Sequence, residues 1–446
     1  SPILVDSETK VSMKSFKAKV ADACEGSFFG NEIDLQNVWR YIYKKSAQRV
    51  VNIPDYVGRL STKGEEGDWL FENCYIRRDG EVVPPDKNGT MWVNGNTRGI
   101  RPKTLSSSLE NAIYSDTVKD IPKMTYNMSP EEREQLTKVF CHMYAQNLGN
   151  VGKALLMIGW AMMNAYSDKI FPKYTFVPFL FGWGGFDTGK STLLKWLLAL
   201  YDMHNHGYST LPNLRSGVGM ERKLAYYASL PVCIDELRAG KDMNEFSGRF
   251  RAWYNRSGRA MGASNSYKEV VQQEVRTNFV FGGQDIFTDD ALRSRTLAVR
   301  ISKEGREMKE SYRAIHRLYM QGRLNAIGYG WIQEALKEDY DKLFAEIEEL
   351  EAHILEKVEK VRNSQVWAIV GIFSKRLATR YFPGFDMESY LTQACVEDDL
   401  AQLESNFLTK FFETVEGLMY QQFSPLTSEH FKVDGDKLMV WFNDVF

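Results

Sequence analysis

The feature that most constrains this chain is the stretch FLFGWGGFDTGKSTLLKW, in which a glycine-rich turn separates an apolar run from an amphipathic one. The turn GGFDTGKS fits the pattern G-x-x-x-x-G-K-[ST], with a predicted buried strand before it (175–182) and a predicted helix after it (190–201). Its glycines let backbone N–H groups converge on phosphate oxygens, and the helix N-terminus adds partial positive charge. This context favours a nucleotide phosphate loop over a chance match. The predicted nucleotide-binding residues are Gly184, Gly185, Phe186, Asp187, Thr188, Gly189, Lys190, Ser191 and Thr192.

A second motif supplies the carboxylates that a phosphate loop needs for hydrolysis. In the loop, Lys190 can reach the β- and γ-phosphates and Ser191 can ligate Mg²⁺. Downstream, the run LPVCIDE ends an apolar strand in Asp235, which suits the Mg²⁺ shell, and Glu236, which suits polarisation of the attacking water. A solvated acidic turn is the weaker explanation, because the order and spacing of the two motifs fit together. No guanine-specifying N-K-x-D sequence is present, so we predict ATP.

Two further elements could complete a catalytic site. The strand-like run NFVFGG ends at Gln284, whose amide could sense the γ-phosphate and hold the water, although it could also be a simple strand-end residue. Then follows DDALRSR, in which Arg293 or Arg295 could reach a nucleotide bound on a neighbouring subunit. The alternative for these arginines is a surface ion pair with Asp289 or Asp290. Arg295 directly precedes the next strand and is the slightly favoured candidate.

A segment between these motifs has a composition suited to nucleic acid. RSGRAMGASNSYKEVVQQEV, residues 256–275, predicts a hairpin that carries Arg259, Lys268 and the aromatic Tyr267. From 238 to 300 there are 11 Lys and Arg against 7 Asp and Glu, a local charge of +4 (11 − 7) in a chain of net charge -2. Cations that follow a phosphate backbone beside a stacking ring are typical of single-strand binding. A hairpin whose cations meet only water is the alternative.

Composition places these motifs in an ordinary soluble globular protein. Apolar residues make up 43% and charged residues 26% of the chain. The longest apolar run, ALLMIGWAMMNA, is too short for a bilayer, which needs about 20 residues. That run, five scattered cysteines and the lack of a signal-peptide pattern favour a cytoplasmic location without membrane contact, the host cytoplasm if the chain is phage-encoded. The chain begins Ser1-Pro2 without methionine, which is compatible with a domain missing upstream.

Patterns along the chain predict four regions. Strand-like and helix-like segments alternate over 172–305, which predicts an α/β core with a parallel sheet flanked by helices. An α+β module over 1–126 includes short strands between Gly and Asp clusters, helices fill 127–171, and 306–446 is helical. Apolar residues at helical spacing over 339–361 predict a packed amphipathic helix rather than a coiled-coil partner site.

Taken in order, the motifs GGFDTGKS, VCIDE, SNSYKE, FGGQD and ALRSR resemble those of superfamily-3 helicases within the AAA+ ATPases. More narrowly, they look like the helicase portion of phage and plasmid primase–polymerase–helicase proteins. The resemblance implies a hexameric ring, an arginine finger supplied in trans, and Lys268 as a DNA-tracking lysine in the central channel. Members of this family often carry a primase upstream, but residues 1–150 have no paired-acid primase signature, so that activity is absent from this chain or was removed from it. The resemblance also implies a collar at 127–171. Gln284 stands where the family usually has asparagine.

Two functions of different classes follow from these predictions. One is an ATP- and Mg²⁺-dependent helicase that moves on single-stranded or forked DNA. The other is a nucleotide-switched AAA+ assembly or DNA-remodelling ATPase that does not unwind. A small-molecule kinase is disfavoured by Glu236 and by the lack of a lid or substrate motif. The local basic excess between the ATPase motifs ranks the helicase first.

Overall fold

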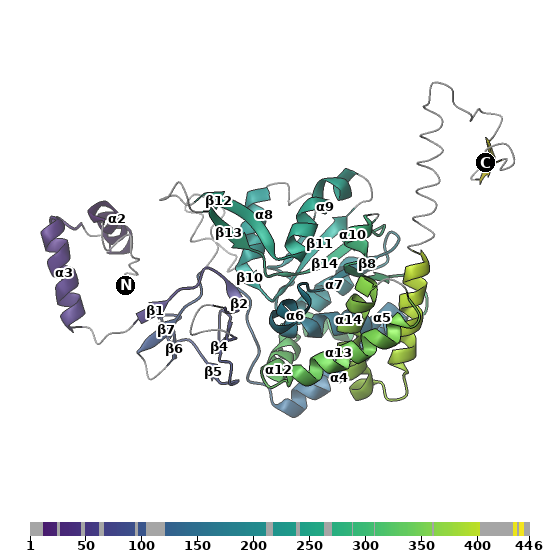
Figure 1. Cartoon of the computed structure of the whole chain (residues 1–446). Helices are drawn as coiled ribbons and strands as arrows, with labels where there is room; N and C mark the ends of the chain where they lie inside the picture. The colour runs from purple at the N-terminus through teal and green to yellow at the C-terminus, as the bar shows by residue number, and fades with distance from the viewer. Residues whose placement is uncertain are drawn as a thin grey trace, which may run out of the picture. The chain divides into compact units, whose positions relative to one another are not determined.

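The computed structural model divides the chain into two compact units, Ser1–Val57 with Asp68–Ile121 and Gly58–Gly67 with Pro122–Phe446 (Figure 1). The described residues are 12–24, 27–45, 50–61, 67–93, 97–103, 121–210, 217–237, 241–262, 270–287, 289–306, 308–358, 361–401, 431–434 and 437–440.

The first unit combines helices with short strands. Helix α2 (Met13–Cys24) is followed by α3 (Glu32–Lys45). Among the strands, β1 runs parallel to β7, β7 runs antiparallel to β6, and β3, β4 and β5 form an antiparallel set. The short strands predicted between turns are therefore present. Their bounds are β1 (Val50–Asn52), β3 (Trp69–Leu70), β4 (Tyr75–Ile76), β5 (Val82–Val83), β6 (Met91–Val93) and β7 (Arg98–Ile100), and β2 (Val57–Arg59) crosses the boundary between the units.

A five-stranded sheet in the order β15-β8-β14-β11-β9 forms the centre of the second unit. Every neighbouring pair in it is parallel, so the carboxyl ends of all its strands meet at one edge. Parallel strands need crossover connections, and helices supply them here. The predicted parallel sheet flanked by helices is confirmed. The strands are β8 (Phe179–Trp183), β9 (Tyr208–Thr210), β11 (Pro231–Leu237), β14 (Asn278–Gly283) and β15 (Thr296–Arg300).

Successive side chains of a strand point to opposite faces of the sheet, and here the two faces carry different residues. On one face, aromatic rings of β8 and β14 meet α9 (Lys241–Tyr254), with Phe281 4.9 Å from Phe250 between ring centroids. On the other face, glycines at Gly182 and Gly282 leave room for Leu194 of α7 (Lys190–Ala199). This close approach holds the start of α7 at the carboxyl edge of the sheet.

Helices precede the sheet, as the sequence predicts. Helix α4 (Pro130–Leu148) begins with a reciprocal capping box, in which the Ser129 hydroxyl accepts from the Glu132 N–H and the Glu132 carboxylate accepts from the Ser129 N–H. The longest apolar run lies mainly in α5 (Val151–Met163), which is buried almost throughout and is followed by η2 (Asn164–Tyr166) and α6 (Ser167–Tyr174). Across the described ranges, no helix is both long and apolar enough to cross a membrane.

The predicted strand over 175–182 is wrong at its start, because β8 begins only at Phe179. Thr175 instead ends α6 in a left-handed conformation with a φ of 65°. Pro178 has no N–H to give to a neighbouring strand, and its carbonyl accepts the indole N–H of Trp160 at 2.9 Å. The strand therefore starts only after the proline.

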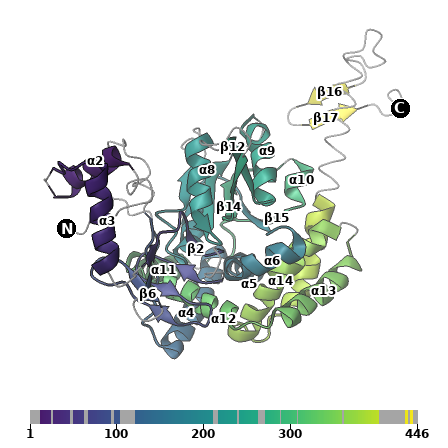
Figure 2. The same cartoon turned by 60° about the vertical axis from the view of Figure 1, so that its left-hand side comes forward.

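Helices also follow the sheet, and α14 packs against both α5 and α13 (Figures 1 and 2). The apolar spacing over 339–361 does correspond to a packed amphipathic helix, but that helix ends at Leu355 and Val361 already begins α14. The spacing runs on because Val358 is buried in the connection. The bounds are α11 (Met308–Met320), α12 (Asn325–Leu336), α13 (Tyr340–Leu355) and α14 (Val361–Tyr381), with helical residues again at 387–401 and a hairpin of β16 (Phe431–Asp434) and β17 (Lys437–Val440).

Candidate nucleotide-binding site

The predicted phosphate loop connects β8 to α7 at the carboxyl edge of the sheet. A side chain at Gly184, where φ is 153°, would lie 2.1 Å from the carbonyl oxygen of Ile301. Gly189 precedes α7 in a left-handed conformation with a φ of 73°. Both positions therefore require glycine, one for close packing of the loop and one for its turn into the helix.

Lys190 lies folded across the loop. Its Nζ donates to the carbonyl oxygens of Gly184 at 2.7 Å and Gly185 at 2.6 Å, and to Thr188 Oγ1 at 3.3 Å. Burial lowers the pKa of the Lys190 ammonium, and the Asp235 carboxylate opposes this shift. The ammonium is thus held by neutral acceptors rather than by a carboxylate at contact distance, so its charge is available to an anionic ligand.

Asp235 is buried at the centre of the site, and its carboxylate accepts three hydrogen bonds. Its Oδ2 accepts from Ser191 Oγ and from the Tyr208 hydroxyl, both at 2.5 Å. Its Oδ1 accepts from the backbone N–H of Glu236 at 2.8 Å. Every donor to this carboxylate is a neutral hydroxyl or amide group.

Glu236 differs from its neighbour although both belong to β11. A register shift between Ile234 and Leu237 interrupts the pairing of β11 with β14, and Glu236 has a φ of 63° and an exposed side chain. A bulge of this kind re-aims a side chain next to an active site. Here it separates the two adjacent acids into one buried and one solvent-facing carboxylate.

A cavity of about 310 Å³ joins these groups at the carboxyl edge of the sheet. Gln284 follows β14, the strand between β8 and β11, so its side chain enters the same cavity. Thr192 lies in the first turn of α7 and is not part of the lining. The lining residues are Phe186, Asp187, Lys190, Ser191, Asp235, Glu236, Leu237, Gly283 and Gln284.

The two candidate arginines lie at the opposite edge of the sheet. They precede β15, whose first residue pairs with the first residue of β8. Arg293 is only 8% exposed and lies 4.0 Å from Asp398, while the Arg295 guanidinium lies 4.9 Å from the ring centroid of Tyr254. Neither lines the cavity of its own chain.

The alternative of a surface ion pair for these arginines is not what the structure shows. The carboxylate of Asp289 pairs with Arg251 of α9, and it caps α10 (Asp290–Arg293) by accepting from the N–H of Leu292 at 3.1 Å. Within the described part of the chain, no ion pair joins Asp289 or Asp290 to Arg293 or Arg295.

The predicted hairpin is present as β12 (Ser257–Gly262) paired antiparallel with β13 (Val270–Glu274). Arg259 belongs to β12. The two other candidates for DNA contact, Tyr267 and Lys268, lie outside the described residues.

Sequence reasoning missed two residues that contact the site. Tyr208 of β9 reaches Asp235, and the guanidinium of Arg306 donates to the carbonyl of Thr188 in the phosphate loop at 2.6 Å. Burial raises the pKa of the Tyr208 hydroxyl, and its hydrogen bond to Asp235 adds to the shift, so it remains a donor at neutral pH. Neither residue belongs to a motif, and only the fold brings them to the site.

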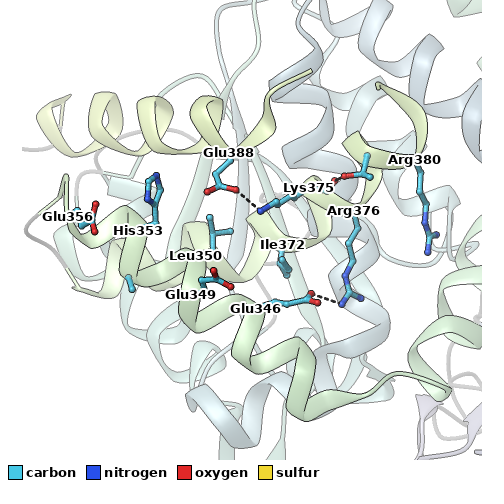
Figure 3. Close-up of a pocket in the computed structure, with 12 residues that line it drawn as sticks. Glu346, Glu349, Leu350, His353, Glu356, Ile372, Lys375, Arg376, Arg380 and Glu388 are labelled. Atoms are coloured by element: carbon cyan, nitrogen blue, oxygen red, sulfur yellow. Dashed lines mark hydrogen bonds and ion pairs between the residues drawn. The ribbon is translucent and has the colours of Figure 1, made fainter. Parts of the chain in front are cut away.

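A second cavity, of about 700 Å³, lies between α13, α14 and the helical residues from 387 onward (Figure 3). We call it the α13–α14 cavity. Four of its charged side chains form two ion pairs, with Arg376 3.0 Å from Glu346 and Lys375 2.5 Å from Glu388. Across the described residues of the chain, no group of three or more His, Cys, Asp and Glu side chains is arranged to hold a metal.

Comparison with known proteins identifies a shared fold. No protein-family model matches the chain, and no curated protein matches its sequence. A solved structure described as the active helicase Cch of SCCmec type IV aligns with 94% of this chain and 75% of that chain, at 14% identity and a TM-score of 0.56. Two apo structures of the NrS-1 C-terminal region also match. One covers 63% of this chain and 69% of that chain at 17% identity with a TM-score of 0.30, and the other covers 82% and 81% at 14% identity with 0.33. The likeness to Cch supports a phosphate-loop α/β core within the same fold.

Proposed function

We propose that this chain is an ATP-dependent DNA helicase that translocates on single-stranded DNA through a hexameric ring during phage or plasmid replication. The observation that carries the proposal is the convergence of Lys190, Ser191, Asp235, Glu236 and Gln284 on one cavity. The fold shared with Cch, a structure described as a helicase, supports the same direction.

The residues of the cavity suit Mg²⁺ and ATP. Oxygen atoms are the ligands that Mg²⁺ prefers, and Ser191 Oγ lies 2.5 Å from Asp235 Oδ2 at the start of α7. When bound, Mg²⁺ neutralises charge on the β- and γ-phosphates. The ammonium of Lys190 would exchange its contacts with Gly184 and Gly185 for phosphate oxygens. The backbone N–H groups of the loop would hold the remaining oxygens.

Hydrolysis needs an acceptor for a proton of the attacking water. Glu236 is exposed to the cavity while Asp235 is held by three donors, so Glu236 is the carboxylate that can orient and polarise water. Gln284, on the same lining, can donate its amide to that water or to the γ-phosphate. The bulge in β11 allows the two adjacent acids to take different roles, because it leaves Asp235 buried and Glu236 exposed.

A ring explains why the arginines lie away from their own cavity. A residue at the amino edge of the sheet cannot reach a nucleotide bound at the carboxyl edge of the same chain, but it can meet one bound by a neighbour. Arg295 is less buried than Arg293, which favours it as the finger that stabilises charge in the transition state. The packed surroundings of Arg293 suit a structural role.

DNA would contact the hairpin of β12 and β13 through Arg259, Tyr267 and Lys268, which supply two cations and a stacking ring. In this proposal, 1–126 is an N-terminal module, 127–171 is a collar, 172–305 is the AAA+ superfamily-3 core and 306–446 is a C-terminal helical domain. An upstream primase-polymerase domain would supply primer synthesis, and the protein would act in the cytoplasm.

The test measures ATP hydrolysis with and without single-stranded DNA, for the wild-type chain and for Glu236→Gln. We expect DNA to stimulate the wild type and the substitution to lower turnover by about 10²–10⁴-fold while nucleotide binding persists. Glu310→Gln, on the exposed surface of α11, is the matched control and should change neither property. Hydrolysis indifferent to DNA would contradict the motor and favour a nucleotide-switched assembly ATPase.

A further inference from the structure

We propose that Tyr208 is a positioning residue that fixes the carboxylate of Asp235 and thereby sets the affinity of the site for the Mg²⁺–nucleotide complex. The inference rests on the proposed ATPase and assigns a part in it to a residue outside its motifs. It concerns β9, the edge strand of the sheet beside β11.

The first support is the geometry around one oxygen atom. Tyr208 pairs in register with Cys233, two residues before Asp235. Its hydroxyl donates to Asp235 Oδ2 at 2.5 Å, and Ser191 Oγ donates to the same oxygen at 2.5 Å. Oδ1 accepts the backbone N–H of Glu236, so the carboxylate is held by donors from α7, from β9 and from its own strand, β11. Rotation of Asp235 would break hydrogen bonds on both of its oxygens.

The second support is that the ring of Tyr208 is itself held in place. Lys195 Nζ lies 4.2 Å from the centroid of that ring. Lys195 is one helical turn after Ser191 on α7, so the same helix presents a hydroxyl to Asp235 and a cation to Tyr208. Tyr208 therefore connects β9 and α7 with β11 at the point where the metal would bind.

The consequence concerns what Asp235 can do when Mg²⁺ is present. If Ser191 Oγ held Mg²⁺, its hydroxyl would keep its proton and donate a hydrogen bond to Asp235 Oδ2, as it does in this structure. The Tyr208 hydroxyl donates to the same oxygen, so it keeps Oδ2 turned toward Ser191 and fixes the carboxylate beside the residues that would hold Mg²⁺. Groups that orient the residues around a metal typically contribute 10–100-fold in metal affinity.

The experiment compares Tyr208→Phe with Tyr201→Phe. Tyr201 is buried and its hydroxyl donates to the Ala161 carbonyl at 3.0 Å, so its substitution removes a tyrosine hydrogen bond far from the cavity. Equilibrium binding of a fluorescent non-hydrolysable ATP analogue is titrated with Mg²⁺, and thermal unfolding is measured in parallel. Tyr208→Phe should raise the Mg²⁺ concentration for half-maximal binding about tenfold, with binding in the absence of Mg²⁺ unchanged.

A second variant tests whether a shifted Mg²⁺ midpoint in Tyr208→Phe could result from misfolding. Lys195→Met keeps the Tyr208 hydroxyl but removes the cation at its ring, and it should shift the Mg²⁺ midpoint by about two- to fivefold. The Tyr201→Phe control should lower the unfolding temperature without moving that midpoint. Wild-type Mg²⁺ dependence in Tyr208→Phe would overturn the inference and leave the ATPase standing. A wild-type chain that binds no Mg²⁺–nucleotide complex would instead overturn the proposed function.

Discussion

The cavity beside the phosphate loop, which we call the nucleotide cavity after its proposed ligand, and the α13–α14 cavity both contain acidic and basic side chains, but these have different partners. At the α13–α14 cavity, Arg376 is paired with two carboxylates, those of Glu346 in the lining at 3.0 Å and of Glu338 outside it at 2.7 Å. In the nucleotide cavity, Lys190 donates to backbone carbonyls and Asp235 accepts from hydroxyls and an amide. The first arrangement joins opposite charges directly, and the second gives both charged groups neutral partners.

The partners of its charged groups, and not its size, make the smaller cavity the candidate site. The α13–α14 cavity is the larger, at about 700 Å³ against about 310 Å³. Its ion pairs join α14 to its neighbouring helices, which suits a structural role (Figure 3). A charged group with neutral partners can still attract a phosphate or a cation strongly. A charged group in an ion pair attracts a further ligand less, because its partner offsets most of its potential.

The largest expected effect comes from a substitution beside the nucleotide cavity that replaces no charged residue. A Cβ atom at Gly282 would lie 2.1 Å from Asp235 Oδ1 and 2.9 Å from Leu194 Cδ1. Gly282→Ala should therefore turn Asp235 away from Ser191 and reduce Mg²⁺-dependent ATP turnover by at least about 100-fold, because the carboxylate proposed for the Mg²⁺ shell is displaced.

Gly248→Ala is the control for that substitution. Gly248 is exposed on α9, and a Cβ atom there meets nothing within 4 Å, so the change should leave turnover intact and stabilise the helix by about 0.5–1 kcal/mol. Steady-state ATPase assays and thermal unfolding check both variants. Normal turnover in Gly282→Ala would show that Asp235 is not confined as the structure indicates.

An intermediate effect is expected from the α13–α14 cavity, and it should appear in stability alone. Arg376→Gln removes the partner of Glu338 and Glu346, and Arg376 is only 23% exposed. Loss of charge-assisted hydrogen bonds at such a site costs about 1.5–3 kcal/mol. We expect that decrease in the free energy of unfolding by denaturant titration, with unchanged affinity for the ATP analogue. A large loss of nucleotide affinity would mean that the two cavities are coupled.

The sequence predicted those parts of the site that depend on local order along the chain. The phosphate loop and the acidic strand are recognisable because strand, turn and helix follow one another within a short stretch. The placement of Gln284 beside them follows from the parallel sheet, in which β14 lies between β8 and β11. The loop, the acidic strand and the parallel sheet can be predicted from the alternation of strand-like and helix-like segments along the chain.

The rest depends on contacts between distant positions. Tyr208 and Arg306 carry no pattern of their own, and they reach the site only because β9 is the neighbour of β11 and the chain after β15 returns to the loop. The bulge at Glu236 is likewise a property of strand pairing. The end of α13 was mispredicted because Val358 is buried outside a helix, so burial continued the apolar spacing after the helix had stopped.

The smallest expected effect sharpens the contrast inside the α13–α14 cavity itself. Lys375 pairs with Glu388 at 2.5 Å, but the two side chains are 46% and 40% exposed, about twice the exposure of Arg376. Exposed pairs of this kind contribute about 0–1 kcal/mol, because water screens them and ordering long side chains costs entropy. Lys375→Gln should therefore change the free energy of unfolding by less than Arg376→Gln does, and added salt should reduce the difference from wild type. An equal loss in the two variants, measured by the same denaturant titration, would show that the cavity acts as one cooperative network rather than as separate pairs whose strength follows their burial.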